Sequence, residues 1–313
     1  MPLQRPAEPL ITVPEPRTQH GLHLNVAPSN WSKPELQRAA EDGEFVLHYQ
    51  PVISLVDGGV SGVEALLRWQ HPTLGVLTAD SFIRAVADAG LLQHLLPEIL
   101  DAACDTAAAL AHGTTRAPFV AVNVDPDQLV DDAVVSIVES ALDSSGARAE
   151  SLVIEMTERT ETLDHAATLA VVSELNDLGV QFAIDDFGTG HSSLARIKRI
   201  PATKVKIDRS FVRDVVDDFD DQAIVASVAL LADGLGLECV AEGIECSDQA
   251  TTVAELGCTS GQGFLWSEAV AAADIADTIQ TAGAAETADA PGPALKRARN
   301  ACTGAQPRQA SRR

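Results

Sequence analysis

Aromatic side chains are scarce in this chain of 313 residues, at 4% of the sequence. Alanine and valine are abundant within the 46% apolar content, so we expect an aliphatic core. The longest apolar run, residues 223–232, contains Ser227 and is far shorter than the roughly 20 residues that cross a bilayer. The first residues contain no apolar stretch typical of a signal peptide. The sequence therefore predicts a cytoplasmic protein without a membrane span.

Cysteine pairs with the spacing of metal sites are also missing. The cysteines are odd in number and none lies in a CxxC pair; they are Cys104, Cys239, Cys246, Cys258 and Cys302. A chain of this length buries enough surface to fold without disulfides. We therefore expect reduced thiols, as in most cytosolic proteins.

Positive charge is the third deficit, because the formal net charge is −23. This charge excludes general binding of nucleic acid or of anionic membranes through the body of the protein. An anionic substrate would need a local positive charge, which a metal ion held by clustered carboxylates supplies. Only the last 18 residues, 296–313, are basic, with six Lys or Arg and no acid. We interpret them as a solvated tail whose partner, if it has one, is unknown.

The chain divides into three parts. Residues 1–32 are rich in proline without a sustained period and predict a disordered arm, and residues 284–313 predict a disordered basic tail. Between them, residues 33–283 alternate short β-branched runs with helical spacing. The expected strands are 45–49, 62–68, 119–124, 152–154, 181–184, 203–207, 237–241 and 261–264, and the expected helices are 81–89, 92–111, 133–142, 165–178 and 222–235. This alternation predicts a single α/β domain with a parallel sheet closed into a (β/α)8 TIM-like barrel.

Polar residues interrupt or end most of these apolar strands. They are Glu64, Asn123, Glu155, Asp185, Asp186, Lys206, Glu242 and Gln262. A charged group at the end of a buried strand is costly to desolvate alone. On successive strands of one barrel, such groups meet at the carboxyl-terminal mouth, where barrel active sites lie. Some of these positions have a plainer alternative: a turn for Asp185–Gly190, an Asx-turn for Asn123, a capping loop for Glu242, and a lysine reaching to solvent for Lys206.

The chemistry of the set is specific. Glu64, Asn123, Glu155, Asp185 and Asp186 offer oxygen atoms, which suit Mg²⁺ or Mn²⁺ better than zinc. Two such ions, bridged where a strand turns into a loop, suit in-line attack on a phosphodiester. Lys206 and Glu242 are then candidates for orienting and deprotonating the attacking water.

Eight short motifs occur in a fixed order through residues 34 to 281. They are YQP at 49–51, EALLRW at 64–69, NV at 123–124, EMTE at 155–158, DDFGTG at 185–190, KID at 206–208, AEGIE at 241–245 and QG at 262–263. Each motif is weak alone, but the ordered set is specific. The chain resembles the EAL domain family, named for Glu64–Ala65–Leu66.

The resemblance implies a barrel that hydrolyses cyclic di-GMP to linear pGpG with two Mg²⁺ or Mn²⁺ ions, and so lowers the level of a bacterial second messenger. It assigns Glu64, Asn123, Glu155 and Asp185 to the first ion, and Asp185 with Asp186 to the second. Lys206 and Glu242 position and activate the water. The remaining roles are substrate contacts for Arg68, Gln50, Leu66 and Gln262, and support of the loop after Asp186 for Glu158. A homodimer is expected by the same resemblance.

Several positions depart from the family's usual residues. His191 stands where the family usually has Tyr, Asp125 where it has Ser, and Cys246 where it has Thr, while Ala79 and Ala269 replace prolines. Asp125 adds negative charge near the expected metal ligands. The competing hypotheses are a receptor that binds the nucleotide without cutting it, a scaffold that works through protein contacts alone, and a different substrate for the same two-metal site. The complete set of ligand residues favours the enzyme.

Overall fold

The computed structural model describes residues 31–112, 117–157, 165–188 and 199–287. Most of the expected arms, residues 1–32 and 284–313, therefore lie outside the described residues. The indole ring of Trp31 packs on Trp69 with ring centroids 4.5 Å apart. At the other end, helix α10 spans Ile275–Thr287. Packed structure thus reaches at least from Trp31 to α10.

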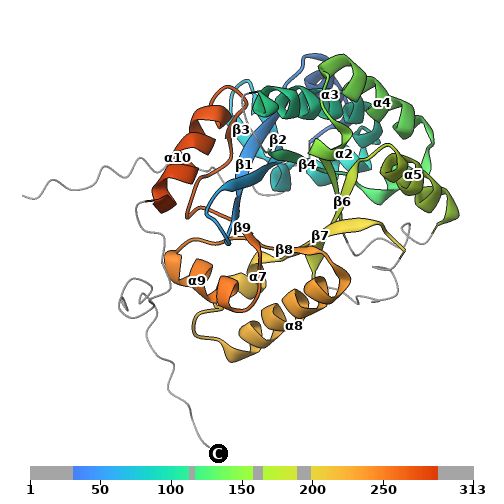
Figure 1. The fold of residues 1–313 in the computed structure, drawn as a ribbon. Coiled ribbons are helices and arrows are strands. Elements are labelled where there is room, and N and C mark those ends of the chain that lie inside the picture. Colours follow the sequence, from blue (N-terminus) through green and yellow to red (C-terminus); the bar gives the residue numbers. More distant parts are fainter. Residues whose placement is uncertain (1–30, 113–116, 158–164, 189–198, 288–313) are drawn as a thin grey trace, which may run out of the picture.

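Eight strands close into a barrel (Figure 1). They are β1 (Phe45–Ser54), β2 (Val60–His71), β4 (Phe119–Asn123), β5 (Leu152–Thr157), β6 (Gln181–Phe187), β7 (Ala202–Ile207), β8 (Glu238–Ala241) and β9 (Ser260–Gln262). Their hydrogen-bonded order is β1-β2-β4-β5-β6-β7-β8-β9, and β9 pairs back to β1. The predicted barrel is confirmed, with every predicted strand at or near its expected place.

The first strand differs from a regular parallel barrel. Strand β1 runs antiparallel to both β2 and β9, whereas the other neighbouring barrel strands pair in parallel. Only residues 55–59 join β1 to β2. A parallel pair needs a crossover of a dozen or more residues, so this short connection allows only a hairpin. In the hairpin register Gln50 lies opposite Glu64, which brings both residues to the same end of the barrel.

Helices surround the barrel (Figure 1). Those of the outer layer are α3 (Leu92–Ala111), α4 (Ala133–Ser145), α5 (Ala166–Asp177), α7 (Arg209–Val212), α8 (Phe219–Leu235), α9 (Ser247–Glu255) and α10. Short 3-10 turns η2 (Pro126–Val130) and η3 (Ala149–Ser151) follow β4 and precede β5. The buried faces of the helices are aliphatic, as the composition predicts; Leu100 of α3, Val138 of α4 and Val172 of α5 are examples. The residue after the last turn of α5, Gly179, has a φ of 103°, which favours glycine and ends the helix as expected.

Side chains that face the barrel interior form layers. The middle layer is made of small residues, Ala121, Val153 and Ala183. Below it, at the amino-terminal ends of the strands, Phe119 fills the barrel beneath the Lys204 ammonium, which lies 4.4 Å from the ring centroid. A Cβ atom on Gly62 would lie 2.5 Å from that ring, so glycine makes room for it. The inward positions above the middle layer are polar and form the mouth.

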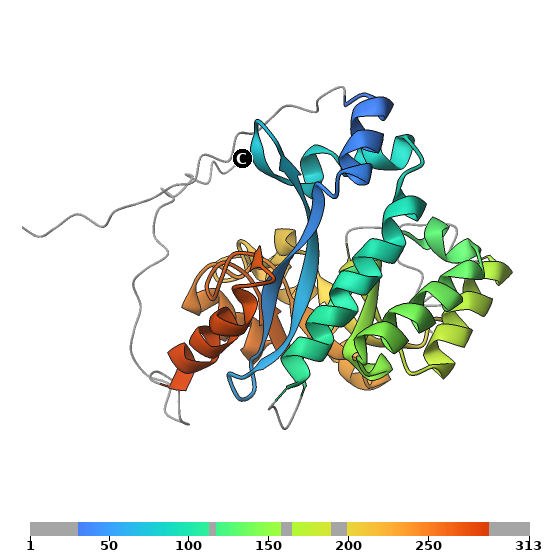
Figure 2. The same ribbon diagram turned by 90° about the horizontal axis from the view of Figure 1, so that it is seen from above.

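The β1–β2 hairpin continues beyond the barrel and carries a small extension (Figure 2). Strand β3 (Gly75–Thr78), turn η1 (Ala79–Ser81) and helices α1 (Lys33–Glu41) and α2 (Ile83–Asp88) pack there. Trp69 is fully buried at its centre and donates to Glu44 Oε2 at 2.8 Å. Four of the twelve aromatic side chains, Trp31, Phe45, Trp69 and Phe82, pack together in this extension, while the barrel core is mainly aliphatic.

Four of the five cysteines lie in the described residues, and none of these four forms a disulfide. Cys239 Sγ and Cys258 Sγ are 3.9 Å apart, on β8 and just before β9. The prediction of reduced thiols is confirmed for these four, while Cys302 lies outside the described residues. None of the helices in the described ranges is both long and apolar enough to cross a bilayer.

Candidate active site

The polar strand ends converge on one ammonium group. Lys206, on β7, is 3% exposed. Its Nζ atom contacts carboxylates from four other strands or strand ends, at 2.7 Å from Glu155, 2.6 Å from Glu242, 3.2 Å from Glu64 and 3.6 Å from Asp185. Four acids thus surround a single buried cation. The predicted convergence at the carboxyl-terminal mouth is what the geometry shows.

Amide side chains fix Glu64 within this cluster. Asn123 Nδ2 donates to Glu64 Oε1 at 2.7 Å, and Gln262 Nε2 donates to Glu64 Oε2 at 2.8 Å. Gln262 Nε2 also donates to Gln50 Oε1 at 2.9 Å. The Gln262 Oε1 atom is buried and has no hydrogen-bond partner. A buried acceptor left unpaired is costly, which indicates that a ligand or water belongs beside it.

Asp185 and Asp186 end β6 in an unusual backbone conformation. Asp186 has a φ of 55°, the one positive value among the described non-glycine residues. Its backbone N–H donates to Asp185 Oδ1 at 2.9 Å. This left-handed residue breaks the alternation of the strand, so that both adjacent carboxylates are presented at the mouth. One oxygen each from Asp185, Asp186 and Glu242 lies within 4.8 Å of the others.

Burial and mutual repulsion dominate the protonation of the cluster. Burial raises the pKa of Glu155 well above its usual value, against the attraction of Lys206. Burial likewise raises the pKa of Glu242 to about 8, again opposed by Lys206 and assisted by Asp185 and Glu64. Burial disfavours the Lys206 ammonium, but the surrounding carboxylates outweigh it and raise the pKa of Lys206 well above its usual value. The cluster therefore has an excess of acid that one lysine does not offset.

The donor set fits divalent cations. Every candidate ligand at the mouth is an oxygen atom, and three carboxylates lie close enough to share one ion. Added positive charge would also relieve the repulsion that raises the pKa of Glu155 and Glu242. The residues present thus suit Mg²⁺ or Mn²⁺, with Asp185 and Asp186 best placed among them. The assignment of each ligand to a particular ion remains a prediction.

The predicted substrate contacts lie along the hairpin above this cluster. Gln50 is buried and joins the site through Gln262, while its Nε2 atom donates to the Ser267 carbonyl at 2.9 Å. Leu66 and Arg68 follow Glu64 at alternate positions of β2, so they share its face of the strand. Burial lowers the pKa of Arg68, while Glu64 and Asp80 oppose that shift. Glu158 and His191 lie outside the described residues.

Two of the departures from family residues have structural roles away from the metal ligands. Asp125 caps the turn η2, accepting a hydrogen bond from the Asp127 backbone at 2.9 Å. Cys246 precedes α9, where Gln249 Oε1 accepts from its backbone N–H at 3.1 Å. The carboxylate of Asp125 therefore caps η2.

Sequence patterns missed some residues of the mouth. His48 lies two residues before Gln50 on β1 and is hydrogen-bonded to the backbone of Ala269, in a half-buried position where burial lowers its pKa. Ser267 contributes through its carbonyl oxygen, which no side-chain pattern reveals. The two-residue alternation of β1 is the signal that places His48 on the same face as Gln50.

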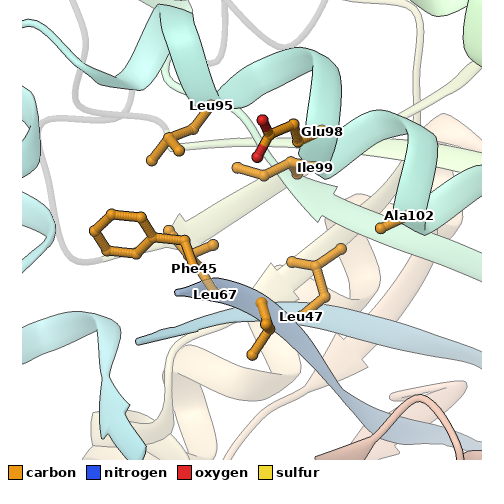
Figure 3. A pocket seen from close by; sticks show the side chains of 8 residues that line it. Phe45, Leu47, Leu67, Leu95, Glu98, Ile99 and Ala102 are labelled. Carbon is orange, nitrogen blue, oxygen red and sulfur yellow. The ribbon is translucent and has the colours of Figure 1, made fainter. Parts of the chain in front are cut away.

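An apolar pocket lies elsewhere, between the hairpin and α3 (Figure 3). Phe45, Leu47, Leu67 and Ile99 are among its lining residues, with Glu98 as the one acid. Its cavity volume of about 40 Å³ has room for a few water molecules at most. A dinucleotide does not fit there, so the charged mouth is the candidate site.

A TIM-like barrel with a cluster of oxygen ligands at its carboxyl-terminal mouth is the arrangement of many metal-dependent enzymes. Residues 33–269 match the family model described as the EAL domain, and the chain belongs to this family.

Relatives agree with this assignment. The chain is 39% identical over 231 residues to the bifunctional diguanylate cyclase/cyclic di-GMP phosphodiesterase MucR of Pseudomonas aeruginosa. The aligned region covers 74% of this chain and 34% of MucR. The chain thus spans about a third of the length of that relative. The solved PaMucR phosphodiesterase in complex with c-di-GMP superposes with a TM-score of 0.73, at 38% identity over 77% of this chain and 98% of that one.

A second solved structure is the manganese and cyclic di-GMP complex of BlrP1 from Klebsiella pneumoniae. It superposes with a TM-score of 0.64, at 30% identity over 72% of this chain and 56% of that one.

Proposed function

We propose that this protein is a cyclic di-GMP phosphodiesterase that opens the cyclic dinucleotide to linear pGpG with two divalent cations, Mg²⁺ or Mn²⁺. The observation that carries the proposal is the cluster of Glu64, Glu155, Asp185 and Glu242 around Lys206, all within 3.6 Å of the ammonium. A binding module has no need for such a concentration of buried acid. The activities named for MucR and the ligands in the two complexes support the same substrate.

The reaction adds water across one phosphodiester. The bond between phosphorus and the 3′ oxygen breaks, the oxygen of water joins the phosphate, and the single linear product carries a 5′-phosphate and a free 3′-hydroxyl. Bound cations would neutralise charge on the phosphate and favour deprotonation of the water. Glu64, Asn123, Glu155, Asp185 and Asp186 are the residues that would hold them.

Lys206 and Glu242 would act on the water. Glu242 lies at the mouth with one carboxylate oxygen 2.6 Å from the Lys206 ammonium, so its carboxylate is placed to accept a proton from a water bound there. Lys206 keeps its charge and donates to Glu242 and Glu155, so it orients both carboxylates. Arg68, on the hairpin, would contact a phosphate oxygen, and Gln50, Leu66 and Gln262 would line the nucleotide. Glu158 would support the loop after Asp186.

The wider setting is part of the same proposal. Cyclic di-GMP is a second messenger inside bacteria, so the activity would lower its level in the cytoplasm. A homodimer is proposed on the family resemblance alone. The basic segment 296–313 has no assigned partner.

The test is an assay of purified protein with cyclic di-GMP in Mg²⁺, in Mn²⁺ and in EDTA, with separation of the nucleotide products. The proposal expects pGpG with a divalent cation and none in EDTA. Tight nucleotide binding without product in either metal would instead identify a receptor.

A further inference from the structure

Two aromatic side chains are exposed in the part of the chain that the structure describes. Phe219 is 83% exposed and Phe264 is 64% exposed. Phe219 begins α8 in the outer layer of helices, whereas Phe264 follows the site residue Gln262 by two positions. A single exposed ring needs no explanation on an outer helix. A ring on the segment that leaves a mouth strand is in a position to meet a ligand.

The turn that carries Phe264 is held against the loop of Glu242. The Ile244 N–H donates to the Gln262 carbonyl at 3.0 Å, and the Leu265 N–H donates to the Ile244 carbonyl at 3.0 Å. A Cβ atom on Gly263 would lie 2.0 Å from the Ile244 oxygen. The close approach that glycine permits therefore fixes the turn beside the residue two positions after Glu242.

The other end of the turn is held by Gln50. Gln50 Nε2 donates to the Ser267 carbonyl, while Gln50 Oε1 accepts from Gln262 at 2.9 Å. The Trp266 N–H donates to the Gly263 carbonyl at 3.3 Å, which closes the turn. Residues 263–267 thus form a fixed part of the rim, bounded by the loop after Glu242 and by Gln50.

The two residues that follow Phe264 pack against the core of the barrel. Leu265 and Trp266 are half-buried and pack on the cluster that contains Ile207, Ala241 and Ile244, and Phe264 is not among the residues of that cluster. The turn is therefore anchored by its second and third apolar residues, and the first presents its ring to solvent at the mouth.

We infer that the Phe264 ring is the stacking surface for one guanine base of the substrate. This inference rests on the proposed function, because a base joined through its ribose to a phosphate at the carboxylates has to extend over the rim. Every nucleobase has a flat face that stacks on aromatic rings, and such stacking contributes to binding without reading the base edge. Phe264 is thus a substrate-binding residue, while Gln50 positions the turn that carries it.

The experiment measures kcat and KM for cyclic di-GMP with Phe264→Ala, Phe264→Leu, Phe264→Trp and the matched control Phe219→Ala. Phe264→Ala is expected to raise KM about tenfold with kcat nearly unchanged, because the ring binds ground state and transition state alike. Phe264→Leu should resemble the alanine variant, and Phe264→Trp should match the wild type. Phe219→Ala, which removes an equally exposed ring, should have no effect.

A wild-type KM in Phe264→Ala or in Phe264→Leu would overturn the inference, since a stacking ring would then be unnecessary. A fall in kcat with unchanged KM would also overturn it. If the wild-type protein hydrolyses nothing, the proposed function fails, and equilibrium binding of cyclic di-GMP to the same four variants decides the role of Phe264 in place of KM.

Discussion

The ammonium of Lys206, on β7, lies 2.6 Å from a carboxylate oxygen of Glu242, the residue that follows the neighbouring strand β8. This contact joins the two residues proposed to handle the water. Burial raises the pKa of Glu242 to about 8, while the neighbouring carboxylates keep the Lys206 ammonium charged beside it. An ion pair kept only for stability would not need three further acids.

Lys206→Met is expected to lower kcat about 100-fold or more, with little change in KM, because the lysine orients the groups that act on water. Lys204→Met is the matched control: Lys204 also faces the interior from β7 but pairs with Glu238 at the opposite end of the barrel. The control should be less stable to heat while its folded fraction keeps the wild-type kcat. Equal losses of kcat in both variants would mean that Lys206 acts through stability.

Glu64→Ala is expected to abolish hydrolysis and to weaken Mn²⁺ binding measured by calorimetry. The substitution removes a candidate ligand and leaves the amide donors of Asn123 and Gln262 without their shared acceptor. Glu98→Ala, at the apolar pocket, removes an acid outside the site and should change neither property. Turnover at the wild-type rate in Glu64→Ala would refute the assigned role of Glu64.

Metal binding should release protons, and its affinity should rise with pH. Without cations, Glu155 and Glu242 have raised pKa values, about 8 for Glu242, so both hold protons at lower pH. A cation needs the carboxylate forms, so affinity is expected to increase as pH rises through about 8, where Glu242 loses its proton. Calorimetry in two buffers with different ionisation enthalpies measures the protons released. The same affinity at about pH 6 and at about pH 8 would contradict the account.

Gly62→Ala should destabilise the fold by about 1–3 kcal/mol, because the new methyl group overlaps the Phe119 ring inside the barrel. Gly234→Ala, near the end of α8, is the control. No atom lies within 4 Å of a Cβ at Gly234, and alanine favours helix, so this change should stabilise slightly. Urea unfolding of both variants gives the comparison, and an unchanged midpoint for Gly62→Ala would show that the barrel interior yields to the added group.

The sequence predicts the barrel and its mouth because two patterns occur together: apolar strands that alternate with helices, and polar residues at the ends of those strands. Buried parallel strands are apolar, so Glu64, Glu155 and Lys206 stand out at once, and barrel geometry brings strand ends together. The spacing of two along β7 also places Lys204 and Lys206 on one face. The distance by which each strand is shifted along its neighbour decides which carboxylates surround each lysine, and this shift is fixed only when the barrel closes.

Other features of the site depend on contacts between distant segments. The pairing of Gln50 with Ser267 joins residues 217 positions apart through a backbone carbonyl, which leaves no trace in residue type. The left-handed conformation of Asp186 is likewise hidden, since aspartate seldom adopts it without tertiary support. Aspartates are typical of both solvated loops and helix starts, and in the acidic run 214–221 Asp218 caps α8 while Asp220 and Asp221 lie in its first turn. The hydrogen bonds that the Asp218 side chain accepts therefore set where the loop ends and the helix begins.

The most direct test of the central claim is hydrolysis of cyclic di-GMP in water enriched in ¹⁸O, with Mn²⁺ or with EDTA, followed by mass spectrometry of the product. The account predicts pGpG with one ¹⁸O atom in its 5′-phosphate when Mn²⁺ is present, and unchanged substrate in EDTA. Label in the product despite EDTA, or no cleavage with Mn²⁺, would contradict a metal-dependent hydrolase centred on Lys206 and its carboxylates.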